Sequence, residues 1–347
     1  MPIAALREQG WATDFSRHSV PLSEFQPGGP PRDGIPPIDH PRIVSIEGGD
    51  RFLTAREPVV VVSAGGQARA YPERILVWHE IVNDTLGGRP IAVTYCPLCN
   101  SAIAFDRRLG GRTFTFGTTG MLRNSDLVMW DRQTQSWWQQ FTGTALVGSL
   151  TGAQLQPLDT QVLSWAMFKA SFPQGTALSQ NTGFDRPYGS NPYVGYDQQP
   201  PAFFTGRVDP RLPAKERVVA VFGTGGTTVV PFSRLAKTSV VAGTAGRTLF
   251  VVLFAHGVVS ALDAEQIPSS ADVGSAGVFD PRLGGRMLSF RPGPAGEFTD
   301  AQTGSRWTLT GNALSGPLQG QRLTAVRHDE QYWFALAAFV PNAMLAR

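Results

Sequence analysis

The 347 residues include only two cysteines, and both lie in one short turn, Cys96-Pro97-Leu98-Cys99, directly after the apolar run 91–95. A CxxC turn that follows a strand can direct two thiolates at one metal ion, and a bound metal keeps its cysteine ligands deprotonated. A structural site of four thiolates is excluded because the chain has no further cysteine. Histidine, methionine, a carboxylate, water or substrate must therefore complete any metal site at this turn.

Two other interpretations of the cysteine pair stay open. A dithiol–disulfide couple of thioredoxin type requires the pair at the start of a helix, whose dipole lowers the pKa of the attacking thiol. Residues 100–105 (NSAIAF) instead have strand character and lead toward Gly110 and Gly111. The other interpretation is that the two thiols are packed without any chemistry. The strand-like sequence after the turn favours the metal site.

His79 is the candidate third ligand. It lies in a helix-like segment, 72–82, and the strand at 91–95 brings the chain back beside that segment. Glu80 or Asp84 would orient its second ring nitrogen, as carboxylates commonly do for metal-bound histidines. A single histidine on a helix is also common as a core or surface residue, and this alternative stays open.

A second group of residues could form a pocket around the metal. The loop 117–126 is dense in hydrogen-bond donors and acceptors, which suits substrate contacts or a buried polar network. Met121 could serve as a soft copper ligand, while gap-filling packing is the commoner role of methionine. The tryptophans at 137 and 138 could wall the pocket or lie in the core. The predicted second shell and pocket comprise Glu80, Asp84, Tyr95, Asn100, Met121, Arg123, Asn124, Asp126, Trp137, Trp138 and His256.

The composition predicts what kind of fold positions these residues. There are 38 glycines and 27 prolines, 16% of the residues are charged, and 42% are hydrophobic. High hydrophobicity with low charge argues against disorder, and glycine and proline cost about 1 and 3 kcal/mol in helix interiors. No apolar run reaches the ~18 residues typical of a transmembrane helix. We therefore expect a mainly β, β-rich α+β fold with short helices.

An internal repeat organises the chain. Residues 101–112 (SAIAFDRRLGGR) recur as residues 275–286 (SAGVFDPRLGGR), and three further colinear matches have similar offsets. Such self-similarity is typical of duplicated structural units. The predicted divisions are an extended Pro/Gly-rich N-terminal arm at 1–55, a first homologous β-rich half at 56–175, a connecting segment at 176–214 and a second β-rich half at 215–347.

The repeat indicates where the chemistry lies. At the place of the cysteine turn, the second half has Phe254-Ala255-His256-Gly257. The fold therefore does not need the cysteines, and their presence in the first half points to function. His256 is expected to be structural, but packing of one half against the other could bring it near the site.

Several motifs are shared with a known family. They are 79–84 (HEIVND), 94–102 (TYCPLCNSA), 105–107 (FDR), 122–129 (LRNSDLVM), 131–134 (DRQT), 138–140 (WQQ), 182–183 (TG), 188–193 (YGSNPY) and 33–39 (DGIPPID). On these motifs, which cover about residues 10–200, the chain resembles the prokaryotic domain-of-unknown-function family 3179. The family signature includes His79 and both cysteines, in agreement with a metal site. The resemblance implies no particular activity.

We therefore expect a transition-metal protein in which Cys96, Cys99 and His79 bind copper or zinc. Two thiolates, an imidazole and a nearby methionine form a soft ligand set, which favours copper slightly. Catalysis would be oxidative or Lewis-acid chemistry on a small molecule. The alternatives are a thiol-disulfide oxidoreductase that uses the same cysteines, and a non-enzymatic protein that stores or transfers copper.

The expected partner is a small-molecule substrate or a metal donor or acceptor. The net charge of +3 comes from scattered basic residues, so nucleic acid is not an expected partner. Residues 1–15 show no secretion signal, which predicts a cytoplasmic location for the chain as numbered, whereas the family resemblance suggests export. No oligomeric state is predicted.

Overall fold

The computed structural model describes residues 3–346 and confirms that the protein is β-rich, with many short strands and few short helices. The α-helices are α1 (Ile3–Glu8), α2 (Ile46–Gly49), α3 (Glu73–His79), α4 (Trp165–Ser171), α5 (Phe232–Thr238) and α6 (Trp333–Phe339). The 3₁₀ turns are η1 (Leu22–Glu24), η2 (Tyr196–Gln198), η3 (Ile267–Ser269) and η4 (Pro294–Gly296). None of the helices in this part of the chain is long and apolar enough to cross a membrane.

The strands before residue 179 build three larger sheets and one two-stranded ribbon. They are β1 (Gln26–Pro27), β2 (Ile43–Val44), β3 (Pro58–Ala64), β4 (Gln67–Pro72), β5 (Ile81–Leu86), β6 (Arg89–Cys96), β7 (Ser101–Asp106), β8 (Arg108–Leu109), β9 (Arg112–Thr113), β10 (Phe116–Arg123), β11 (Asp126–Asp131), β12 (Trp137–Gln139), β13 (Ala145–Val147), β14 (Gln156–Leu158), β15 (Thr160–Ser164) and β16 (Thr176–Leu178). The sheet orders are β15-β3-β4-β16-β2, β14-β7-β6-β5 and β1-β10-β11-β12-β13, and β8 pairs with β9.

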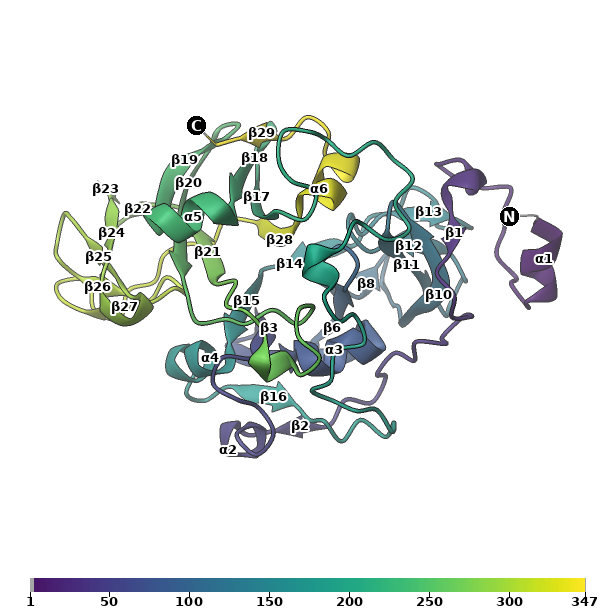
Figure 1. Ribbon diagram of the computed structural model, residues 1–347, viewed down its shortest axis with the longest axis horizontal. Helices are drawn as coiled ribbons and strands as arrows, with labels where there is room; N and C mark the ends of the chain where they lie inside the picture. Colours follow the sequence, from purple (N-terminus) through teal and green to yellow (C-terminus); the bar gives the residue numbers. More distant parts are fainter. Residues whose placement is uncertain (1–2, 347) are drawn as a thin grey trace.

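The strands after residue 216 form a further group of sheets. They are β17 (Arg217–Gly223), β18 (Gly226–Pro231), β19 (Val240–Ala245), β20 (Thr248–Ala255), β21 (Ser275–Phe279), β22 (Arg282–Leu283), β23 (Arg286–Met287), β24 (Phe290–Pro292), β25 (Phe298–Asp300), β26 (Arg306–Trp307), β27 (Ala313–Ser315), β28 (His328–Tyr332) and β29 (Met344–Leu345). Their orders are β28-β17-β18-β29, β19-β20-β21 and β24-β25-β26-β27, and β22 pairs with β23. The sheets β10–β13 and β24–β27 lie on opposite sides of the molecule along its long axis, and α1 lies beyond β10–β13 (Figure 1).

The glycine-rich turns join strands in the conformations that only glycine adopts without strain. Gly65 and Gly66 connect β3 to β4 with φ of 55° and 76°, which suits the two-residue hairpin turns favoured by strand twist. A side chain on Gly65 would clash with the backbone oxygen of Gly87, because the next hairpin turn packs directly against this one. Glycine is therefore required there by both conformation and space.

The main hydrophobic core joins strands from both ends of the chain. It includes Val60 and Val62 of β3, apolar side chains of the helix α3, and the hairpin of β6 and β7 that ends in the cysteine turn. Side chains of β17, β28 and α6 belong to the same cluster, so residues after 215 cover the cysteine hairpin from one side. The cysteines thus lie in the interior of the molecule.

Candidate functional site

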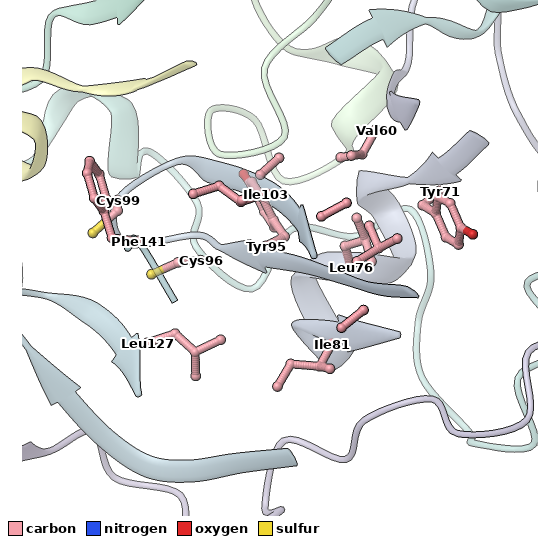
Figure 2. Packing of buried hydrophobic residues seen from close by; sticks show 14 of the residues in the cluster. Val60, Tyr71, Leu76, Ile81, Tyr95, Cys96, Cys99, Ile103, Leu127 and Phe141 are labelled. Atoms are coloured by element: carbon pink, nitrogen blue, oxygen red, sulfur yellow. The ribbon is translucent and has the colours of Figure 1, made fainter. Parts of the chain in front are cut away.

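The cysteine turn closes the hairpin of β6 and β7. Cys96 is the last residue of β6 and pairs with Ser101, the first residue of β7, so the four residues between them form a tight connection. Asn100 has a positive φ of 51°, a conformation that asparagine tolerates better than most residues. Both cysteines are free thiols and are almost fully buried at the end of the hairpin (Figure 2). No helix begins at either cysteine.

Distant segments hold the backbone of this turn. The amide of Tyr332, at the end of β28, donates to the Cys99 carbonyl at 2.9 Å. The Tyr196 hydroxyl donates to the Leu98 carbonyl at 3.1 Å. The turn is therefore fixed from both the connecting segment and the C-terminal part of the chain.

Asp126 is the third potential ligand next to the two sulfurs. Asn124 and Ser125 connect β10 to β11 with φ of 51° and 70°, and this turn places Asp126 at the start of β11. One ligand atom each from Cys96, Cys99 and Asp126 lies within 4.8 Å of the other two. The Cys96 sulfur also lies 3.7 Å from the Ser125 carbonyl oxygen. Two thiols and one carboxyl group thus converge in a buried site.

The Asp126 carboxyl group is held on one side and free on the other. Its Oδ2 accepts hydrogen bonds from Gln139 Nε2 at 2.5 Å and from the Phe141 amide at 2.9 Å. Its Oδ1 is buried and has no hydrogen-bond partner among the described residues. Arg123 in turn donates to the Gln139 side-chain oxygen and pairs with Glu24, which fixes the orientation of the amide. One oxygen of Asp126 therefore remains available toward the thiols.

Burial dominates the electrostatics of the three groups. Loss of hydration raises the pKa of both the Cys96 and Cys99 thiols, that of Cys99 most strongly. Burial also raises the pKa of Asp126 to about 7, against the hydrogen bonds from Gln139 and Phe141 that hold it down. Without a cation, the cluster therefore favours its protonated, neutral forms.

Lys215 supplies a positive group near the cysteines. Its Nζ lies over the Tyr196 ring, 2.8 Å from the ring centroid, and 4.3 Å from that of Tyr332. Within the described chain this nitrogen is buried without a hydrogen-bond partner. Burial lowers the Lys215 pKa to about 7, and the negative charges of Asp197 and Cys99 oppose that shift. An anionic cluster would therefore hold Lys215 in its charged form.

His79 does not join the cysteine cluster. Its Nδ1 donates to the Pro36 carbonyl at 2.7 Å, and its Nε2 is hydrogen-bonded to the Tyr188 hydroxyl at 2.6 Å. Its ring also packs against Phe184. Both nitrogens are thus engaged, and the histidine connects the end of α3 to the N-terminal and connecting segments. Asp126 stands at the third position of the cluster, where we had expected His79.

Glu80, the residue after His79, is near enough to the cluster for its charge to act on Cys96 and for the charge of Asp126 to act on it. It ends α3 with a positive φ of 58°, and its amide and carbonyl are fixed by Leu76 and Tyr95. Its side chain is 7% exposed and makes no hydrogen bond with any described residue. Burial, and next the charge of Asp126, raise the Glu80 pKa to about 8. Glu80 is therefore close to the cluster and lacks a protein partner.

Of the other predicted pocket residues, some lie around the cluster and others serve the fold. The Tyr95 hydroxyl donates to Asn100, which supports the cysteine hairpin. Asp84 accepts from Tyr71 and Arg69 and so does not orient His79. Met121 lines a cavity beside Glu80.

The remaining three lie in other surroundings. Trp138 donates to Asp131 in the same sheet, and Trp137 packs with Trp11, Phe15 and Phe25 in a separate core. The His256 side chain is 61% exposed, with Asp272 as its nearest acidic partner.

Three features of the site were not predicted from sequence. Lys215, Gln139 and Tyr193 lie near the cluster or its cavity but were not among the predicted site residues. Gln139 and Tyr193 belong to the shared segments 138–140 and 188–193, which could have singled them out. Lys215 has no such signal because only the tertiary fold brings it near the cysteines.

The family comparison covers almost the whole chain. The family model described as "Protein of unknown function (DUF3179)" matches residues 32–343. The chain therefore belongs to this family, and the match extends beyond the motifs at 10–200 to include the second group of sheets. No curated protein and no solved structure matches the chain.

Proposed function

We propose that Cys96, Cys99 and Asp126 bind one transition-metal ion, with zinc preferred to copper. The observation that carries the proposal is the convergence of three buried ligand atoms from Cys96, Cys99 and Asp126, and the Oδ1 of Asp126 has no hydrogen-bond partner among the described residues. Zinc bonds of about 2.0–2.3 Å place neighbouring tetrahedral ligands roughly 3.3–3.8 Å apart. The three atoms, all within 4.8 Å of one another, are close enough to reach this geometry by small side-chain movements.

The donor chemistry favours zinc. A carboxylate is a harder ligand than the imidazole expected from sequence, and copper(I) prefers a fully soft set. Zinc accepts both thiolate and carboxylate ligands. The preference for copper from the sequence depended on His79 and Met121. Both ring nitrogens of His79 are hydrogen-bonded to Pro36 and Tyr188, and Met121 lines the cavity beside Glu80. Replacing the imidazole by Asp126 therefore shifts the preference to zinc.

Three protein ligands suit a catalytic metal site better than a structural one. A tetrahedral ion would keep a fourth position for water or substrate, as catalytic zinc sites do. Glu80 lies beside this site and lines a cavity. We infer Lewis-acid chemistry on a small molecule, with the ion polarising the substrate and Glu80 holding or moving a proton.

The surrounding charges support an ion in this place. Two thiolates and one carboxylate carry three negative charges, so the site keeps a net charge of −1 when it binds a divalent cation. Lys215, which has no hydrogen-bond partner among the described residues, can balance that charge. Gln139 donates a hydrogen bond to Oδ2 of Asp126 and so orients this carboxylate, as residues around metal ligands commonly do.

The two alternative functions have less support. A thioredoxin-type dithiol requires a low thiol pKa at a helix start, whereas these thiols lie in a β-turn and burial raises their pKa. A protein that hands copper to a partner requires an accessible site. The cysteines are at most 1% exposed, which opposes direct transfer.

Metal analysis of the whole chain tests the proposal. The protein would be loaded with zinc, desalted and analysed for metal, beside Cys96→Ser, Cys99→Ser and Asp126→Asn. We expect about one equivalent of zinc in the parent chain and a loss of most of it in each variant. Cobalt substitution should add thiolate-to-metal absorption that the cysteine variants lack.

The exposed His256→Ala variant is the control and should keep its metal. A parent chain that binds no zinc would contradict the proposal. Retention of zinc by Asp126→Asn would contradict the assignment of the third ligand. Circular dichroism of each variant separates loss of metal from loss of fold.

We also infer that the halves 56–175 and 215–347 are copies of one unit, with the arm and connecting segment outside the repeat. The order β15-β3-β4, β7-β6-β5 and β10–β13 recurs as β28-β17-β18, β21-β20-β19 and β24–β27. Asp131 and Asp300 each accept from a tryptophan at 2.9 Å in equivalent sheets. Separate expression of residues 56–175 and 215–347, followed by an assembly assay, tests whether each half is a folding unit.

A further inference from the structure

A cavity of about 120 Å³ lies beside the proposed metal site. Leu98, inside the cysteine turn, and Leu127, next to Asp126, form part of its wall, so the cavity adjoins the cluster. The N-terminal segment covers it with Pro30 and Ile35. Its size suits a small molecule held within the protein rather than a polymer on its surface.

The wall of this cavity is mostly apolar and carries one ionisable acidic group, Glu80. Three leucines, an isoleucine and Met121 supply much of the apolar lining, together with Pro30 and Phe203, and Thr118 and Tyr193 add two hydroxyl groups. Glu80 makes no hydrogen bond or ion pair with any residue that the structure describes. Burying a carboxyl group without a partner costs free energy. A bound ligand that pairs with Glu80 would offset this cost.

The ionisable groups at and next to the cavity are acidic. Among the residues that the structure describes, no lysine, arginine or histidine lines it. Arg123, at the end of β10, is engaged with Glu24 and Gln139. Asp126 is close enough for its charge to act on Glu80. The cavity lining therefore supplies no cationic side chain for an anionic ligand, which would depend on the proposed metal ion for its counter-charge.

Aromatic rings complete the wall. Tyr193 and Phe203 both line the cavity, and Phe203 is 45% exposed at its outer side. The faces of such rings attract organic cations, while their apolar bodies exclude water. Phe203 also has a positive φ of 54°, a conformation that bulky residues rarely adopt outside constrained sites.

We propose that this cavity binds a small organic ammonium ion, with its cationic head at Glu80 and its apolar body against the leucine and aromatic walls. The inference rests on the proposed function, because it names the substrate class for the same site. The ammonium group would form the ion pair that Glu80 lacks within the chain. The rest of the molecule would extend toward the open side of the metal.

Binding of matched small probes tests this inference. The zinc-loaded chain would be titrated by calorimetry with n-butylammonium, n-butanol and butyrate, which share one apolar body. We expect n-butylammonium to bind at least tenfold more tightly than the other two. Glu80→Gln should remove this preference, whereas Glu73→Gln, a buried glutamate outside the cavity, should keep it. Leu122→Phe should fill the cavity and weaken binding without loss of zinc.

Zinc content measured in the same samples separates the two proposals. Zinc with no preference for n-butylammonium overturns the inference about the cavity and leaves the metal site in place. Binding of n-butylammonium without any zinc overturns the metal site alone. Equal binding of n-butanol, or full binding by a folded Glu80→Gln protein, also overturns the inference.

Discussion

Glu80 and Ser239 occupy equivalent places at the ends of α3 and α5 and have nearly the same positive φ, 58° and 56°. The amide of each closes its helix, and the carbonyl of each accepts from the second strand after the helix, from Tyr95 of β6 in one case and Phe254 of β20 in the other. The fold therefore imposes this backbone conformation in both places. Only the first place combines it with a buried acidic side chain beside the cysteines.

Glycine at these two positions should separate backbone strain from function. Relief of the positive φ should stabilise both Glu80→Gly and Ser239→Gly by about 1 kcal/mol. Glu80→Gly should also lose the preference for n-butylammonium, whereas Ser239→Gly should keep it. Denaturant unfolding and calorimetric titration measure the two effects. Loss of the preference in Ser239→Gly would indicate an indirect structural cause instead.

The β-rich fold could be predicted because its signals are local. Paired glycines such as Gly65 and Gly66 mark the hairpins, and valine runs mark the buried strands. The cysteine turn was also local, since both sulfur ligands come from four consecutive residues. The two sulfur ligands could therefore be predicted from the sequence alone.

The third ligand was not accessible in the same way. Asp126 was expected only as a pocket residue, because its approach to Cys96 depends on how two separate hairpins pack. His79 was favoured for its chemistry and its closeness in sequence. Its position is decided by Pro36 and Tyr188, one far before and one far after it in the chain. Such long-range contacts leave no local pattern.

Gln139 should control metal affinity through Asp126. Gln139→Leu removes the hydrogen bond to Oδ2, and loss of such a partner typically weakens metal binding 10–100-fold. Gln140→Leu is a matched control, because Gln140 is equally buried but donates to Thr94 and Ser101. Competition with a zinc chelator measures both affinities. Equal weakening in the two variants would argue against a specific role of Gln139.

His79 should contribute to stability and not to zinc content. His79→Phe removes the hydrogen bonds to Pro36 and Tyr188, which should lower the free energy of unfolding by about 1–3 kcal/mol. Tyr188→Phe removes one of the same bonds and should cost less. Metal analysis of both folded variants should still give one equivalent of zinc. A folded His79→Phe protein that binds no zinc would indicate that His79 is a metal ligand.

Glu73 should make stability depend on pH. It is 4% exposed, and burial raises its pKa from 4.5 to about 7. A carboxyl group with a higher pKa in the folded state binds its proton more tightly there, so its contribution to stability is lost as the pH rises from about 4.5 to about 7. The loss has an upper limit of about 3 kcal/mol, because one pKa unit corresponds to about 1.4 kcal/mol. Glu73→Gln should therefore be more stable than the parent chain at pH 8 and equally stable near pH 4. Urea unfolding at the two pH values measures the difference, and an equal gain at both would show that the substitution acts through packing rather than through the charge.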